Sequence, residues 1–193
     1  MLIGFDLDGT LTDWNGYWIP KVERYLGYST GKKAYSLEEN FNLTTEEADK
    51  ICSLFGADYD LNAPMKPYMN LVFMYLEQKE IDYCIISNRL GNGAIRGEMW
   101  FEDNILNELS KLFDNLHFKG YYWNDVKTIK APICKKLNID LMIEDAEYQL
   151  TALDKVHIPI IKMVETFNTE APGIPCKNGL EVIEAIKKQF QLN

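Results

Sequence analysis

The strongest constraint on the fold is a regular alternation of two kinds of segment between about Pro64 and the C-terminus. Short apolar runs rich in β-branched residues are separated, in most cases, by segments whose apolar residues recur with the period of a helix. The apolar runs are residues 81–87, 117–122, 139–143 and 156–163, with an earlier one at residues 2–7. The helical segments are residues 68–78, 99–113, 129–137 and 180–190. This alternation predicts a parallel sheet with helices on both faces.

The apolar runs are continuous, as in IDYCIIS (residues 81–87) and IDLMIED (residues 139–145). A strand that is buried on both faces has this pattern, because neither of its sides meets water. In open sheets of this kind, ligands bind beyond the carboxyl ends of the strands. The polar residues at those ends are therefore the candidates for a functional site.

Residues 14–63 do not follow the alternation. They contain an aromatic cluster, WNGYW, and two helix starts of the capping-box type, at Ser36 with Glu39 and at Thr44 with Glu47. We therefore expect a small, mostly helical insertion after the first strand. The expected α/β core then comprises residues 1–13 and 64–193.

Composition narrows the possible partners. The chain has 193 residues, of which 47% are hydrophobic, which suits one domain with a modest insertion. Its formal net charge of −9 argues against a nucleic acid polymer or an anionic membrane as partner, but is compatible with a small phosphorylated ligand. No apolar stretch approaches membrane-spanning length, and no basic segment leads into an apolar one at the N-terminus. Four cysteines without a CxxC pair favour buried free thiols, disfavour zinc and predict a reduced cytoplasmic location.

The first apolar run ends in FDLDGTLTD, where one residue separates two carboxylates. Residues two apart on a strand face the same way, so Asp6 and Asp8 can converge on one point. Their repulsion is costly unless a cation or a shared proton offsets it. Gly9 allows a tight turn, and the amides that follow it, beginning with Thr10, can face an anion.

Two other strand ends carry polar groups of complementary kinds. The run at residues 81–86 ends in Ser87-Asn88, a hydroxyl and an amide suited to contacts with an oxyanion. The run at residues 139–143 ends in the acidic pair Glu144-Asp145. Lys130 stands ahead of that run, near the start of an expected helix, and Lys127 is its rival three positions away. Each feature is common on its own, but their shared placement around the strand ends indicates a functional site.

Taken in order, DLDGTLTD, Ser87, Lys130 and Glu144-Asp145 resemble the motifs of the haloacid dehalogenase superfamily of phosphotransferases, over nearly the whole chain. The resemblance implies an α/β fold with a Rossmann-like three-layer core, a parallel sheet, and a small helical cap inserted after the first strand. It also implies a magnesium-dependent phosphoryl transfer through an aspartyl phosphate. Magnesium favours oxygen ligands, and its charge offsets the repulsion between a carboxylate nucleophile and a phosphate dianion.

The resemblance also assigns roles to residues of this chain. Asp6 would be the nucleophile, and Asp8 the general acid and later the general base. The implied phosphate-binding residues are Gly9, Thr10, Ser87, Asn88 and Lys130. The implied Mg²⁺ ligands are Asp6, the Asp8 backbone carbonyl and Asp145, with Glu144 as a further candidate, directly or through water. Many members have another aspartate after the last acidic pair, whereas this chain reads EDAEYQ, with Glu147, which leaves the outer metal ligands open.

The expected cap would select the substrate, because it covers the active site and shapes the pocket. Trp14, Tyr17 and Trp18 follow the catalytic loop and could stack on a planar base, or else pack the cap against the core. The compact ending, from KAPICKKLNIDLMIEDA to VHIPIIKM, looks most like the 5′(3′)-deoxyribonucleotidase group and its bacterial relatives. This likeness suggests a nucleoside monophosphate, with phosphorylated sugars and other small esters open.

Three other functions fit part of the pattern. A phosphomutase shares the aspartyl phosphate but returns the phosphoryl group to its substrate. A phosphoryl-accepting switch also uses clustered acids, a hydroxyl and a lysine on a parallel sheet, but the insertion directly after the DxD motif fits a catalyst better. A binding protein with a degenerate site is disfavoured, because every catalytic position of the motif is filled.

Overall fold

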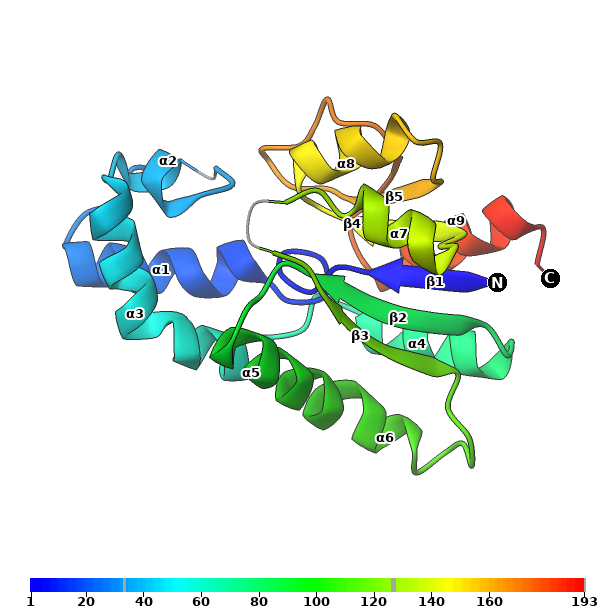
Figure 1. Cartoon of the computed structure of the whole chain (residues 1–193). Coiled ribbons are helices and arrows are strands. Elements are labelled where there is room, and N and C mark those ends of the chain that lie inside the picture. The colour runs from blue at the N-terminus through cyan, green and yellow to red at the C-terminus, as the bar shows by residue number, and fades with distance from the viewer. Residues whose placement is uncertain (33, 126–127, 193) are drawn as a thin grey trace.

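A computed structural model describes residues 1–32, 34–125 and 128–192. Its centre is a six-stranded sheet in the order β3-β2-β1-β4-β5-β6, in which every neighbouring pair is parallel (Figure 1). The strands are β1 (Leu2–Phe5), β2 (Asp82–Ser87), β3 (Phe118–Trp123), β4 (Leu141–Glu144), β5 (Ile160–Met163) and β6 (Ile174–Cys176). The helices beyond residue 64 are α4 (Met69–Gln78), α5 (Asn92–Phe101), the π-helix η1 (Glu102–Leu106), α6 (Asn107–Leu109), α7 (Ala131–Leu137), α8 (Glu147–Asp154) and α9 (Gly179–Phe190). The predicted α/β parallel-sheet architecture is confirmed.

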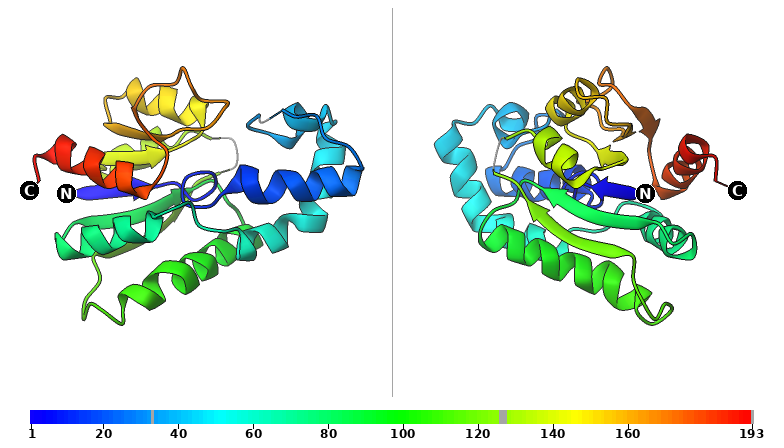
Figure 2. Two further views of the ribbon diagram at one scale, coloured as in Figure 1. Left: turned by 180° about the vertical axis from the view of Figure 1, so that it is seen from behind. Right: turned by 45° about the vertical axis from the view of Figure 1, so that its right-hand side comes forward.

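The sheet is buried on both faces, so the continuous apolar runs have the expected cause. On one face, alternate strand residues such as Phe5 and Ile85 pack against α4, α5 and α9. On the other face, residues such as Cys84 and Met142 pack against α7 and α8. Figure 2 shows the yellow helices α7 and α8 on one side of the sheet and the red helix α9 on the other. The sheet is therefore the middle of three layers, with a layer of helices on each face.

The described residues 14–32 and 34–62 contain three helices beyond the carboxyl ends of the strands, where the arrowheads of β1 and β2 point in Figure 1. They are α1 (Trp14–Leu26), α2 (Leu37–Phe41) and α3 (Thr45–Asn62), with their own apolar cluster that includes Trp18, Val22 and Phe41. Both predicted helix starts are confirmed. The full capping box forms at Thr44, whereas the Ser36 side chain accepts a hydrogen bond from the Glu39 amide.

The structure corrects the bounds of one predicted helix and adds two elements that were not predicted. The helix expected at residues 99–113 begins earlier, at Asn92, and its last turn ends at Leu109. The three glycines in GNGAIRG argued against a helix at this position. Packing explains one of them, because a Cβ on Gly97 would lie 3.0 Å from Leu7 Cδ2 and 3.2 Å from Arg89 Nη1. The edge strand β6 and the eight-residue helix α8 were not predicted, because both are short and β6 contains a proline.

The cysteines also depart in part from the expectation. All four thiols are free, and Cys84, Cys134 and Cys176 are buried as predicted, but Cys52 is exposed on α3. Among the described residues, none of the helices combines the length and the apolar character that crossing a bilayer requires.

Candidate active site

A cavity of about 1080 Å³ lies between the carboxyl ends of the strands and the helices α1–α3. Its core-side wall contains most of the residues selected from the sequence: Asp6, Asp8, Gly9, Ser87, Asn88, Lys130, Glu144 and Asp145. A neighbouring cavity of about 910 Å³, beside α7 and α8, contains none of them. The topology explains the convergence, because β2, β1 and β4 are adjacent and parallel, and residues that follow parallel strands meet at one edge of the sheet.

Three carboxylates gather around one lysine in this wall. Lys130 Nζ lies 2.5 Å from Asp6 Oδ1 and 2.6 Å from Glu144 Oε2. Asp6, Glu144 and Asp145 each place one oxygen within 4.8 Å of the other two, and all three side chains are buried. Glu144 Oε1 also accepts hydrogen bonds from the backbone N–H groups of Asp145 and Ala146. The four side chains carry a formal charge of −2 when all are ionised.

This excess of negative charge fits a cation. Burial, followed by repulsion from Glu144, raises the pKa of Asp6 to about 8. Burial and then the charges of Glu144 and Asp6 raise the pKa of Asp145 well above its usual value. The same acids raise the pKa of Lys130, against the opposing effect of its burial. A hard cation with oxygen ligands would offset the repulsion that these shifts express.

The turn after β1 is fitted closely to this cluster. Gly9 has φ +74°, and a Cβ there would lie 2.2 Å from Asp145 Oδ2, so a side chain is excluded both by conformation and by space. The buried Thr10 hydroxyl donates to Asp145 Oδ1 at 3.1 Å. The Thr10 side chain therefore holds Asp145 and does not line the cavity, while the expected phosphate contact of the backbone amides after Gly9 stays a prediction.

The end of β2 contributes one hydroxyl and one amide to the cavity wall. Ser87 is 1% exposed, in line with its place at the last position of the strand. Asn88 lines the cavity, but its side-chain amide donates to the carbonyls of Asp125 and Thr128 at 2.7 and 2.9 Å. The Asn88 side chain therefore also holds Asp125 and Thr128, which follow β3.

Lys130 is anchored by α8. Its backbone N–H donates to Gln149 Oε1 at 2.7 Å, and Gln149 Nε2 donates to the Thr128 carbonyl at 2.8 Å. The rival Lys127 lies outside the described residues. Glu147 begins α8 and lines the neighbouring cavity, away from the three carboxylates. Asn168, which the sequence did not single out, donates to the carbonyl of Asp145 at 2.6 Å and so supports the acidic loop.

Asp8 belongs to a second set of charges, which the sequence reasoning missed. Arg89 Nε and Nη2 donate to the two Asp8 carboxylate oxygens at 2.9 and 2.6 Å. Arg89 Nη1 lies 3.3 Å from Asp60 Oδ1 on α3, and Arg96 also pairs with Asp60 at 2.8 Å. Burial acts to raise the pKa of Asp8, but the charge and hydrogen bonds of Arg89 outweigh it, so the pKa is lowered. The position of Arg89, directly after Ser87-Asn88, was a signal in the sequence, whereas Asp60 had none.

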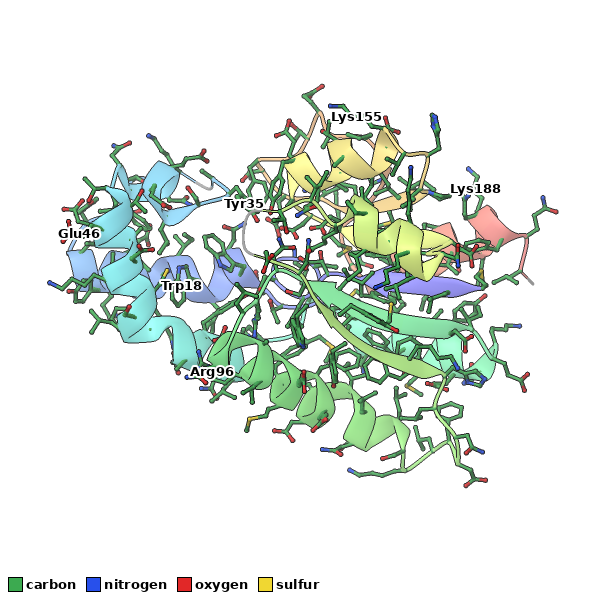
Figure 3. The ribbon with its side chains drawn as sticks, viewed as in Figure 1. Trp18, Tyr35, Glu46, Arg96, Lys155 and Lys188 are labelled. Atoms are coloured by element: carbon green, nitrogen blue, oxygen red, sulfur yellow. The ribbon has the colours of Figure 1, made fainter. Side chains whose placement is uncertain are left out.

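The opposite wall of the cavity comes from α1–α3 and is rich in aromatic side chains. Trp14 and Trp18 line it, whereas Tyr17 does not and instead accepts a hydrogen bond from Lys21 at 2.8 Å. Trp18 is buried within the cluster of α1–α3, edge-on to Tyr59 (Figure 3). Tyr35 crosses to the core, where its ring contacts those of Tyr148 and Phe167.

The chain has the Rossmann-like fold of haloacid dehalogenase-like hydrolases. Three similar solved structures are a predicted phosphatase from Clostridium acetobutylicum (17% identity, TM-score 0.68, 97% of this chain and 98% of that one), a haloacid dehalogenase-like family hydrolase from Streptococcus pneumoniae (15%, 0.65, 96% and 97%) and a predicted phosphoglycolate phosphatase from Haemophilus somnus (14%, 0.64, 96% and 97%). Neither a protein-family model nor a curated protein matches the sequence. At these identities the likeness establishes the fold.

Proposed function

We propose that this chain is a magnesium-dependent phosphatase that hydrolyses a small phosphate monoester through an aspartyl phosphate on Asp6. The observation that carries the proposal is the arrangement around Asp6. A buried carboxylate at the end of β1 contacts the Lys130 ammonium at 2.5 Å and shares a cavity with Asp8, Ser87 and Asp145. Each group has a task in phosphoryl transfer, and all of them face one space.

Asp6, Asp145 and the Asp8 backbone carbonyl would hold the Mg²⁺ ion. Bound there, the ion supplies positive charge where a carboxylate and a phosphate dianion must approach. Glu144 suits an indirect role better, because its two oxygens already accept bonds from Lys130 and from two backbone N–H groups. The Thr10 hydroxyl keeps one Asp145 oxygen oriented. Three buried acids and a single lysine leave the negative surplus that such an ion would neutralise.

In the first half of the reaction, an Asp6 carboxylate oxygen attacks phosphorus and the ester oxygen departs. Asp8 gives that oxygen its proton, so that an alcohol leaves rather than an alkoxide. Lys130 and Ser87 hold the oxygens of the transferring group, because an ammonium and a hydroxyl both donate to developing negative charge. The backbone amides after Gly9 complete the cradle.

In the second half, water attacks the phosphorus of the aspartyl phosphate. The Asp8 carboxylate takes a proton from that water, Asp6 departs as a carboxylate, and inorganic phosphate is released. Dividing the reaction in this way replaces one difficult displacement by two easier ones. Asp8 returns to its protonated state and is ready for the next ester.

We further propose a nucleoside monophosphate as substrate, with helices α1–α3 acting as the cap. The cavity has room for a nucleoside, and the aromatic side chains Trp14, Trp18 and Tyr35 line it. A sugar phosphate is the alternative, and so is a phosphomutase reaction. A similar structure from Thermotoga maritima, provisionally described as a beta-phosphoglucomutase, supports the latter (16% identity, TM-score 0.60, 97% of this chain and 98% of that one). A cytoplasmic location stays a prediction from the sequence.

The test is phosphate release from a panel of deoxynucleoside monophosphates, sugar phosphates and p-nitrophenyl phosphate, with Mg²⁺ or with EDTA. Asp6→Asn is the matched control, because it keeps the shape of the side chain and removes the nucleophile. Magnesium-dependent release that this variant abolishes supports the phosphatase, and the ranking of esters identifies the substrate class. Isomerised sugar phosphate without net release would favour the mutase. A folded protein that retains a stable acyl phosphate and releases nothing would favour the switch.

A further inference from the structure

Arg89 connects two carboxylates that belong to different parts of the chain. Through Nε and Nη2 it forms a two-pronged contact with Asp8, at 2.9 and 2.6 Å, in the turn after β1. Through Nη1 it faces Asp60 of α3 at 3.3 Å. One planar guanidinium therefore joins the expected acid–base residue to the helical wall of the cavity, where Figure 3 shows Arg96 at the same junction of α5 and α3.

The surroundings of Arg89 leave it little freedom. The residue is 8% exposed, and its guanidinium carbon lies 5.6 Å from the centre of the Tyr59 ring. The bare face of Gly97 makes room for it, since a Cβ there would come within 3.2 Å of Nη1. Asp60 is itself held by Arg96 through two contacts of 3.0 and 2.8 Å. Arg89 Nη1 lies at ion-pair distance from Asp60 but has no hydrogen-bond partner among the described residues, so the fork to Asp8 is the hydrogen-bonded side of the guanidinium.

A forked contact sets the plane of a carboxylate as well as its position. Asp8 is half-buried, and Arg89 is its cationic partner among the described residues. When Asp8 carries a proton, one oxygen becomes an O–H donor and gives up its contact with Arg89, while the other oxygen can keep its own. The remaining contact would still aim the O–H group at the space above Asp6.

We propose that Arg89 is a positioning residue for Asp8, and that its contact with Asp60 makes this positioning depend on α3. The inference rests on the proposed function, because it assumes that Asp8 transfers protons. Arg89 touches no reacting atom in this scheme. Arg89 acts through Asp8. Its substitution should therefore slow the hydrolysis of esters whose leaving group needs a proton, and should change little the hydrolysis of esters whose leaving group does not.

The experiment compares two esters in Arg89→Gln and Arg89→Lys. An alkyl phosphate from the substrate panel needs a proton on its leaving oxygen, whereas p-nitrophenolate departs without one. We expect Arg89→Gln to lower kcat for the alkyl ester about 100-fold, the size of effect that a misplaced catalytic group produces. The loss for p-nitrophenyl phosphate should be about 10-fold or less. Arg89→Lys keeps the buried charge without the fork, so its alkyl-to-aryl ratio should fall between those of the wild type and Arg89→Gln.

Arg96→Gln is the matched control. It removes the other arginine that pairs with Asp60, beside the same helices, but makes no contact with Asp8. Its alkyl-to-aryl ratio should stay closer to that of the wild type than the ratio of Asp60→Asn, because Asp60 keeps its contact with Arg89, and Asp60→Asn should lower the ratio by less than Arg89→Gln does. Circular dichroism and thermal melts identify which variants are folded. If Arg89→Gln does not fold, the alkyl-to-aryl ratio of Arg89→Lys tests the proposal instead.

Equal losses on both esters in the Arg89 variants would overturn the proposal, since a structural or phosphate-binding role gives that result. An equal change of ratio in Arg96→Gln would also overturn it, because the effect would then come from the anchoring of α3. If the wild-type protein hydrolyses neither ester, the proposed phosphatase function is refuted, and the proposed role of Arg89 is refuted with it. Wild-type activity with an unchanged ratio in both Arg89 variants removes this inference alone.

Discussion

Replacing Asp145 with asparagine should stabilise the metal-free protein while abolishing its response to magnesium. Asp145 lies within 4.8 Å of both Asp6 and Glu144, and all three carboxylates are buried. Once Asp6 and Asp145 are both ionised, above their raised pKa values, they repel at that separation by about 3.5 kcal/mol at an effective dielectric constant of about 20. Lys130 and Lys66 attract the same carboxylate, so the net relief should be smaller, on the order of 2 kcal/mol. Asparagine can still accept the Thr10 hydrogen bond.

The measurement is a thermal melt in EDTA and in excess Mg²⁺. For a chain of this size, a gain of about 2 kcal/mol raises the melting temperature by about 4–8 °C. Mg²⁺ should raise the melting temperature of the wild type, because it binds the folded state, and should leave Asp145→Asn nearly unchanged. Asp154→Asn is the control: it removes one exposed carboxylate from α8 and should change stability by no more than about 0.5 kcal/mol.

The pH dependence gives an independent check on the same cluster. The pKa of Asp6 is raised from 3.8 to about 8, so the folded state binds more protons than the unfolded state between those values. Metal-free stability should therefore be greatest below about pH 4 for this group and fall as the pH rises towards 8. The fall should be shallower in Asp145→Asn, which removes one of the repelling charges. A variant that is less stable than the wild type in EDTA, with an unchanged pH slope, would refute the reasoning.

Three other substitutions test single features. Lys130→Met leaves two buried carboxylates without their cation and should cost about 3–5 kcal/mol in urea unfolding, together with loss of turnover. Gly97→Ala should destabilise by about 1–3 kcal/mol in the same assay, because crowding against Leu7 at 3.0 Å exceeds the gain in helix propensity; a stabilised variant would show that the helix shifts freely. Thr44→Ala removes the capping box with Glu47 and should cost about 1 kcal/mol, read from the unfolding midpoint.

The sequence predicted the sheet and the strand-end residues well for one physical reason. In a parallel sheet that is buried on both faces, each strand is a continuous apolar run, and the residue after it lies at a shared edge. Asp6, Ser87 and Glu144 therefore meet without any knowledge of loop structure. The helix starts at Ser36 and Thr44 were also readable, because capping chemistry is local.

What the sequence could not show depends on contacts between distant segments. The pairing of Arg89 with Asp60 joins α3 to the loop after β2, and no local pattern marks Asp60 among the many acids of the chain. The start of α5 could not be predicted either, because it also depends on contacts between distant segments. Gly97 lowers helix propensity, so the sequence argues against a helix there. The reason for a glycine is seen only in the structure, where Leu7 and Arg89 occupy the space that a Cβ would need.

The two aspartates of the DxD motif are given opposite electrostatic surroundings although one residue separates them. Asp6 shares Lys130 with Glu144 and has its pKa raised to about 8, while Arg89 lowers the pKa of Asp8. Without a cation these shifts run opposite to the proposed roles, because a nucleophile must be ionised and a general acid must carry a proton. Because Asp6 is ionised at neutral pH only when further positive charge offsets its neighbours, ionisation of the proposed nucleophile and occupation of the proposed metal site would be linked. Asp8 is held instead by Arg89, which faces Asp60 of α3, so under the proposal for Arg89 proton transfer would depend on the helical wall.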